Sequence, residues 1–374
     1  MKKQLRILAV ARQRTACGFY RIWMPARIMR KLGHDVTCVE NASYYDIMKP
    51  DLERWMTEHL GEFDIILTDR CIASSQLGLF AGLRHHSPNA RLIVDFDDDF
   101  LNPPWWNDSK KSYLPGKPYR EIGIQHLRAA EMAVVSTPQL AERFAKRTHR
   151  IHTSLNLIDP ADWTGLPTNP DRAKDPRLRV LYGGASGHYG DMDEAQIGLQ
   201  AVIENPPVPF RLITFGAMPQ WLHEAERRYP DRIINIPWVG TMWSYAQAVA
   251  WGGFDLAIAP LADHPFNTAK SNIKWLEAAL QGIPMLCSNI GPYAEIPDGC
   301  AIKIDNSPVQ WAEGMRELLK NVDLREKIRA AAFAEVMEKW TLDKGLEVWN
   351  NILEEASKAP RILTLEDTML PADL

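Results

Sequence analysis

The N-terminal half of the chain alternates short apolar runs with segments of helical periodicity. The apolar runs predict buried strands, because they are short and flanked by polar residues or glycine; they cover residues 5–10, 35–39, 64–68, 92–96 and 132–136. Helical patterns cover residues 19–32, 72–84 and 139–147. Strand, helix and strand in this order form a βαβ unit, whose strands are parallel. This half is therefore predicted to be a doubly wound α/β domain.

The C-terminal half repeats the same alternation after residues 156–177, which are rich in Pro, Asp and Asn and predict a linker. Strands are expected at residues 178–182, 210–215, 233–236, 254–260, 284–288 and 301–304. Helices are expected at residues 243–251, 307–320, 323–339 and 342–357, besides one that begins near residue 267. We predict an N-terminal Rossmann-like domain over residues 1–165, a second one over 166–342, and a last helix with a loose tail over 343–374.

The helix that begins near residue 267 carries two side-chain stripes. Ile273, Leu276 and Leu280 form an apolar stripe, and Lys270, Lys274 and Glu277 form a charged one. We expect Asn267 or Thr268 to cap this helix, and Gly282 and Pro284 to end it. The two lysines then oppose the helix dipole, and a bound anion at the helix start would remove that conflict. The alternative is an ordinary solvated stripe.

A glycine-rich turn follows the strand predicted at residues 178–182. In Gly-Gly-Ala-Ser-Gly-His-Tyr-Gly-Asp, the candidate ligand-binding residues are Gly184, Ser186 and His188. Such a turn lets backbone N–H groups approach a phosphate closely. It has neither the Gly-x-Gly-x-x-Gly nor the Walker spacing, so the sequence supports neither an NAD site nor a P-loop.

An acidic run follows the strand predicted at residues 92–96. Asp95, Asp97, Asp98 and Asp99 repel one another and cannot all be buried without partners. Three interpretations stay open: the carboxylates bind a divalent metal, one of them acts at the reaction centre or holds an acceptor hydroxyl, or they cap the following turn. The next residues, 103–120, are rich in Pro and Trp and predict an ordered functional loop.

Charge and cysteine usage narrow the functional class. The 374 residues have a net charge of −4, which does not favour nonspecific nucleic-acid binding. No signal peptide and no membrane-spanning stretch is visible. The cysteines are odd in number and lack Cys-x-x-Cys spacing, so reduced thiols and a cytoplasmic location are expected; they are Cys17, Cys38, Cys71, Cys287 and Cys300.

The segment at residues 266–293 resembles a known donor-binding segment. Its pattern is Phe-Asn-x-x-Lys-Ser-x-x-Lys-x-Leu-Glu, then Gly-Ile-Pro, then Ser-Asn-Ile-Gly-Pro-Tyr. It is similar to that of GT-B glycosyltransferases, and most of all to the retaining group called family four or group 1. In that family a Glu at the position of Glu277 binds the ribose of a sugar nucleotide, and a nearby Lys meets the phosphates. The chain departs from the family at Ala269, where a second Glu is common.

The resemblance implies a GT-B fold, with two Rossmann-like domains facing across a cleft and the last helix returning to the first domain. It implies a UDP- or GDP-linked sugar as substrate, with no cofactor and no metal, because the Asp-x-Asp metal site belongs to another glycosyltransferase fold. On the catalytic side it points to Asp97, Asp98, Asp99 and Lys270. The donor-binding candidates are Gly18, Gly184, Ser186, His188, Asn267, Ser271, Lys274 and Glu277.

Tyr-Arg-x-x-x-Pro after a Gly loop is a further similarity, and it would place Gly18 and Arg21 at the cleft. The alternative there is an amphipathic helix with a surface arginine. The leading interpretation is a retaining glycosyltransferase whose acceptor is a glycan, a lipid, a small molecule or a modified phage-type DNA base, the last not favoured by charge. The alternatives are a GT-B-fold sugar-nucleotide epimerase and an inactive sugar-nucleotide-binding protein.

Overall fold

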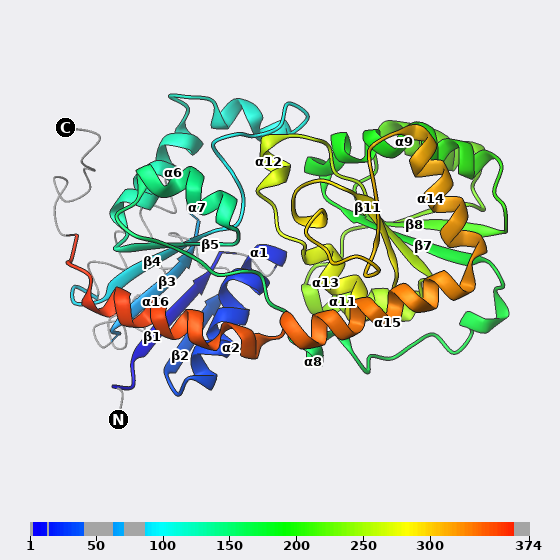
Figure 1. Cartoon of the computed structure of the whole chain (residues 1–374). Coiled ribbons are helices and arrows are strands. Elements are labelled where there is room, and N and C mark those ends of the chain that lie inside the picture. Colours follow the sequence, from blue (N-terminus) through cyan, green and yellow to red (C-terminus); the bar gives the residue numbers. More distant parts are fainter. Residues whose placement is uncertain (1–2, 13–14, 41–62, 71–86, 363–374) are drawn as a thin grey trace.

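The computed structural model describes residues 3–12, 15–40, 63–70 and 87–362. Figure 1 shows two α/β domains that face each other, each built around a six-stranded parallel sheet. The predicted architecture of two doubly wound domains is thereby confirmed. The helix predicted at residues 72–84, Cys71 and the tail beyond residue 362 lie outside the described residues. No helix in the described ranges combines the length and the apolar character that crossing a membrane requires.

The first sheet has the strand order β2-β1-β3-β4-β5-β6. In register, Ile7 of β1 lies between Val36 of β2 and Ile65 of β3. Helices cover both faces of this sheet, which is why its central strands read as continuous apolar runs. The strands are β1 (Arg6–Ala11), β2 (Asp35–Glu40), β3 (Ile65–Asp69), β4 (Arg91–Phe96), β5 (Met132–Val135) and β6 (Ile151–Thr153).

The helical segments of the first domain differ from the predicted ones in two places. The helix expected at residues 19–32 is a π-helical turn followed by an α-helix. The loop expected at 103–120 contains a 3-10 helix and the start of an unpredicted α-helix at residues 118–129. The segments are α1 (Ala16–Gly18), the π-turn η1 (Phe19–Trp23), α2 (Met24–Lys31), η3 (Asp108–Tyr113), α6 (Pro118–Ala129), α7 (Pro138–Phe144) and η4 (Ala145–Arg147).

The second sheet has the strand order β12-β11-β10-β7-β8-β9. Its strands are β7 (Leu178–Gly184), β8 (Phe210–Gly216), β9 (Ile233–Ile236), β10 (Leu256–Ala259), β11 (Met285–Ser288) and β12 (Ile302–Ile304). Its helical segments are η6 (Ser186–His188), α9 (Tyr189–Glu204), α10 (Gln220–Arg228), α11 (Met242–Gly252), α12 (Pro265–Thr268), α13 (Ile273–Leu280), η7 (Gly291–Tyr293), α14 (Pro308–Lys320) and α15 (Val322–Lys339).

The segments that join the domains are packed rather than loose. The linker contains α8 (Pro160–Trp163) and η5 (Arg172–Lys174), and the Trp163 side chain is buried. At the other end of the chain, η8 (Leu342–Gly345) leads into α16 (Leu346–Lys358). Figure 1 shows α16 lying along the first domain, where it contacts α2 and β4. One apolar cluster therefore runs through both domains, from Ile7 and Ile22 to Leu276 and Trp349.

Candidate active site

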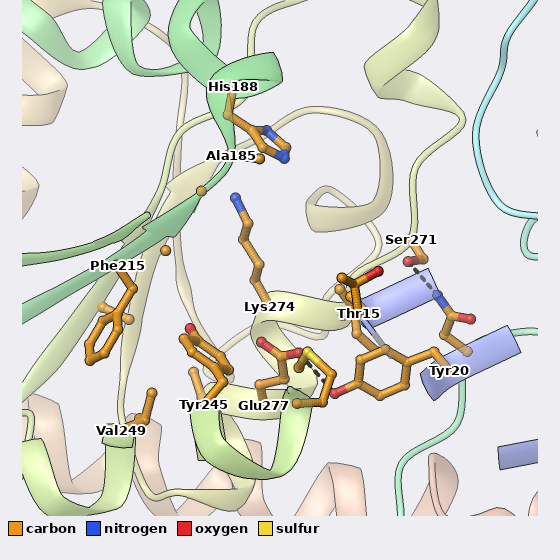
Figure 2. Close-up of a pocket in the computed structure, with 18 of the residues that line it drawn as sticks. Thr15, Tyr20, Ala185, His188, Phe215, Tyr245, Val249, Ser271, Lys274 and Glu277 are labelled. Carbon is orange, nitrogen blue, oxygen red and sulfur yellow. Dashed lines mark hydrogen bonds between the residues drawn. The ribbon is translucent and has the colours of Figure 1, made fainter. Parts of the chain in front are cut away.

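A cavity of about 480 Å³ lies between the two domains. The first domain lines it with the start of α1 and with the segment after β4. The second domain lines it with the loops after β7 and β9, with Phe215 of β8 and with residues 270–277. Figure 2 shows side chains from both domains converging on it. In parallel α/β sheets, ligands bind beyond the carboxyl ends of the strands, and this cavity has that position in both domains.

The helix expected to begin at Asn267 or Thr268 is interrupted. The short α12 ends at Thr268, and α13 begins at Ile273 after the N-cap residue Asn272. Asn267 caps neither helix, since it lies inside α12, whose N-cap is His264. Its buried amide nitrogen donates to Asp191 Oδ1 at 2.6 Å and to the Ala262 carbonyl at 2.9 Å. Lys270 consequently lies in the turn between the two helices.

Lys270, Lys274 and Glu277 nevertheless meet at the same cavity. Lys270 Nζ lies 4.7 Å from the Phe266 ring centroid, and Lys274 Nζ lies 5.5 Å from that of Tyr182. Burial, and next the charge of Lys270, lowers the pKa of Lys274 to about 8. Within the described ranges neither lysine forms an ion pair. An anion in the cavity would therefore have two cations free to meet it.

Glu277 points toward the first domain as well as into the cavity. Its Oε1 accepts a hydrogen bond of 2.8 Å from the Tyr20 hydroxyl. Burial raises the pKa of Glu277 to about 7, although the Tyr20 hydrogen bond and the charge of Lys274 act in the opposite direction. The ionised carboxylate, which accepts hydrogen bonds, therefore predominates only above about pH 7, in a place where water is largely excluded.

The glycine-rich turn begins where β7 ends at Gly184, and Gly184 and His188 line the cavity. The imidazole Nδ1 of His188 lies 2.7 Å from Asp191 Oδ2. Burial, and next the charges of Lys270 and Lys274, lowers the pKa of His188 to about 4. A neutral imidazole held in this way donates Nδ1–H to Asp191 and leaves Nε2 as an acceptor.

Asp97 and Asp98 line the cavity from the first domain, opposite the lysines. Arg70 Nη1 lies 3.0 Å from an Asp98 oxygen and 3.8 Å from an Asp97 oxygen. Burial acts to raise the pKa of Asp97, but the Arg70 charge and a hydrogen bond with Cys17 outweigh it and lower that pKa. Among the described residues, no group of three or more His, Cys, Asp and Glu side chains is arranged to hold a metal ion.

Asp99 has a different place from its two neighbours. It is buried outside the cavity lining and accepts hydrogen bonds from the Leu101 backbone at 3.1 Å, from the Asn102 amide at 2.7 Å and from Arg143. Arg143 also donates to the Pro265 carbonyl at 2.6 Å. Asp99 therefore caps the turn after β4 and helps to anchor the second domain.

Three other predicted residues, Gly18, Ser186 and Asn267, also lie outside the cavity lining, whereas Ser271 is part of it. The expectation that Arg21 faces the cleft is wrong. Arg21 is buried and pairs with both Asp95 oxygens at 2.8 and 2.7 Å, because the π-turn aims it into the sheet. Its neighbour Tyr20 is the residue that reaches the second domain.

Residues not singled out from the sequence complete the site: Tyr20, Asp191, Trp106, Trp238 and Tyr245. Trp106 Nε1 donates to the Gly187 carbonyl at 3.1 Å, so the loop of the first domain rests on the glycine-rich turn. A Cβ at position 190 would come within 2.3 Å of the Trp106 ring, so only glycine fits at this position. Two of them had a sequence signal: Asp191 lies three positions after His188, and Tyr20 is the tyrosine of the Tyr-Arg-x-x-x-Pro motif.

Comparison with known proteins rests on structure. No protein-family model matches the sequence. No curated protein matches it either. Similar solved structures include HepE of Anabaena with UDP and glucose (TM-score 0.63, 15% identity, covering 94% of this chain and 100% of that chain). Sucrose-phosphate synthase of Thermosynechococcus elongatus has a TM-score of 0.65 at 13% identity, covering 94% and 99%.

A glycosyltransferase of Rickettsia africae ESF-5 is similar over the same extent, with a TM-score of 0.62 at 14% identity and coverage of 94% of this chain and 99% of that chain. Together with the two parallel sheets, these likenesses show that the chain has the GT-B fold.

Proposed function

We propose that this protein is a glycosyltransferase that moves a sugar from a UDP- or GDP-linked donor to an acceptor, with retention of configuration. The observation that carries the proposal is the meeting of Lys270, Lys274 and Glu277 at one cavity between two domains of a GT-B fold. Two cations without ion-pair partners suit a diphosphate, and a buried carboxylate beside them suits a ribose diol. Solved structures of the same fold include HepE of Anabaena in complex with UDP and glucose.

The geometry suggests how the donor lies. The diphosphate occupies the start of α13, where the backbone N–H groups and the two lysines favour negative charge. The ribose lies on Glu277, and the base extends toward Trp238, which is 54% exposed while lining the cavity. The glycine-rich turn with His188 covers the side of the diphosphate from which the sugar departs.

The chemical demand is to stabilise the diphosphate as its charge grows during bond cleavage. Lys270 and Lys274 are preorganised for this purpose in a partly desolvated cavity, so electrostatic stabilisation requires no metal ion. Trp106 ties the first domain to the glycine-rich turn, and holding the domains together in this way limits hydrolysis by water. Asp97 and Asp98 face the lysines from the acceptor side and accept hydrogen bonds from acceptor hydroxyls.

The acceptor is a hydroxyl compound bound from the first domain, such as a glycan, a lipid-linked sugar or a small molecule. A DNA base is a weaker candidate because the chain has a net charge of −4.

The test begins with calorimetric titration of UDP and GDP into the wild type and the Glu277→Ala variant. A charge-assisted hydrogen bond is worth about 1.5–3 kcal/mol, so the variant should bind about ten- to a hundredfold more weakly. Incubation of the preferred sugar nucleotide with glycan, lipid and DNA acceptors follows. Sugar-nucleotide conversion without any acceptor would instead indicate an epimerase, and tight binding with no turnover would indicate a binding protein. Wild-type affinity in Glu277→Ala would remove the ribose role.

A further inference from the structure

Tyr20 and Glu277 join the two domains at the cavity wall. Their hydrogen bond of 2.8 Å spans 257 positions of sequence and is buried, and Figure 2 shows it beside Lys274 and Tyr245. Tyr20 belongs to η1 in the first domain, and Glu277 belongs to α13 in the second. Separating the domains would therefore break this bond and expose the carboxylate to solvent.

The Tyr20 ring is held in place by its surroundings. The Phe19 ring packs edge-on against it at 5.0 Å between centroids, and Phe19 in turn packs at 4.9 Å against Trp243 of the second domain. The next residue, Arg21, is anchored in the opposite direction by Asp95. π-Helical turns are rare and often occur at functional sites. Here the π-turn directs Tyr20 toward Glu277 of the second domain and the next residue, Arg21, toward Asp95 of the first.

The hydrogen bond has consequences for the carboxylate. With Oε1 occupied by Tyr20, Glu277 presents Oε2 to a ligand in the cavity. The charged or titratable groups that face Glu277 are the Lys274 ammonium on its own helix and, from other elements, the neutral hydroxyls of Tyr20, Tyr245 and Tyr293. Tyr20 is the one of these whose hydrogen bond favours the charged carboxylate.

We propose that Tyr20 is a positioning residue for nucleotide recognition: from the opposite domain its hydroxyl orients the Glu277 carboxylate, so that ribose is recognised only when the domains are together. This inference rests on the proposed function, in which Glu277 accepts a hydrogen bond from ribose. A nucleotide that binds more tightly when Tyr20 contacts Glu277 than when the domains are apart shifts the population toward closed domains.

The pH dependence gives the proposal its signature. Glu277 must be ionised to accept hydrogen bonds from both Tyr20 and ribose, so nucleotide affinity falls as the pH drops through the pKa of Glu277, which burial raises to about 7. Removing the Tyr20 hydroxyl removes a group that lowers this pKa. The loss of affinity then begins at a higher pH, by about one unit for a hydrogen bond worth about tenfold in affinity.

The experiment titrates UDP and GDP into wild type, Tyr20→Phe, Glu277→Gln and the double variant from pH 6 to 9. Tyr229→Phe, which loses a hydroxyl far from the cavity beside Arg228 and Arg232, is the matched control. We expect Tyr20→Phe to bind about tenfold more weakly at pH 7 and to shift the pH profile upward. In the Glu277→Gln background, Tyr20→Phe should not move the profile.

Each other result overturns this proposal or the proposed function, and the two are distinguishable. Wild-type affinity and profile in Tyr20→Phe would overturn the positioning role. Weaker binding with an unmoved profile would also overturn it, since that result indicates packing alone. Failure of the wild type to bind either nucleotide would overturn the proposed function instead.

Discussion

The imidazole of His188 lies 2.7 Å from the carboxylate of Asp191, one helical turn away at the start of α9. Asp191 is 1% exposed and accepts two further hydrogen bonds, from the Ala262 backbone at 3.1 Å and from Asn267 at 2.6 Å. The carboxylate is thus fixed from three directions. It sets both the orientation and the tautomer of the one imidazole seen at the cavity among the described residues.

Asp191→Asn should therefore lower the rate of glycosyl transfer without changing the shape of the site. An amide in place of the carboxylate weakens the hold on the Nδ1–H tautomer, so we expect glycosyl transfer to slow by about ten- to a hundredfold. Steady-state kinetics with the preferred sugar nucleotide measures this. Asp193→Asn, two residues along the same helix and bonded to Trp221, is the control and should behave as wild type. Equal rates in the two variants would contradict a role for the His188–Asp191 pair.

Lys270→Ala should reduce turnover more than affinity. Charge on the diphosphate grows toward the transition state, so an interaction with Lys270 strengthens as the sugar leaves. Losing one preorganised partner of a developing anion costs about a hundredfold or more in kcat. The kcat and KM values of the variant decide the matter, with the exposed Lys320→Ala as control. A rise in KM with unchanged kcat would instead show that Lys270 binds the substrate and the transition state equally well.

Chelation should leave activity intact. Asp97 and Asp98 face Arg70, which already supplies positive charge between them, and the lysines supply it on the donor side. We expect enzyme dialysed against EDTA to retain its rate. A rate that collapses and returns only with Mg²⁺ or Mn²⁺ would contradict this prediction and indicate a metal held by the acidic run.

Arg21→Met should destabilise the protein strongly. It leaves Asp95 buried without its partner, and breaking a buried ion pair from one side costs about 3–5 kcal/mol. The double variant Arg21→Met/Asp95→Leu, which removes both charges, should recover a large part of that loss. Urea unfolding followed by circular dichroism measures both free energies. A double variant less stable than the single one would show that the pair contributes through more than mutual neutralisation.

His126 should make the fold sensitive to acid. It is fully buried between α6 and β4 near Phe96, and burial lowers its pKa from 6.5 to about 3. The unfolded chain therefore binds a proton between about pH 6.5 and 3 that the folded chain does not, and stability falls as the pH falls through that window. The contribution is about 1.4 kcal/mol per pH unit. His126→Gln should lose this slope in urea titrations at pH 7, 6 and 5, whereas exposed His223→Gln should keep it.

The sequence was sufficient for the elements that are buried on both faces. Central strands such as β1, β5 and β10 appear as short apolar runs. Glu277 and Lys274 could be found because helical spacing relates residues of one segment. The sequence pattern assigns no range to β6, α6, α9 or α10. The sequence does not show that Tyr20 rather than Arg21 reaches the other domain, because a π-turn decides this. It also does not show that Asp99 lies outside the cavity, because a contact with the distant Arg143 decides that.

The chain crosses between the domains twice, and the two crossings are tied together. The Ile158 N–H donates to the Trp340 carbonyl at 2.9 Å, and Ile158 pairs with Thr341 in a short parallel bridge. Because the two crossings are adjacent and bonded, we expect them to bend together as a hinge when the domains separate. In Figure 1 this hinge lies near α8, whereas the segment between β4 and α6 spans the domains at the opposite edge. We therefore expect Trp106, which belongs to that segment, to move farther from the second domain than residues near the hinge when the domains separate.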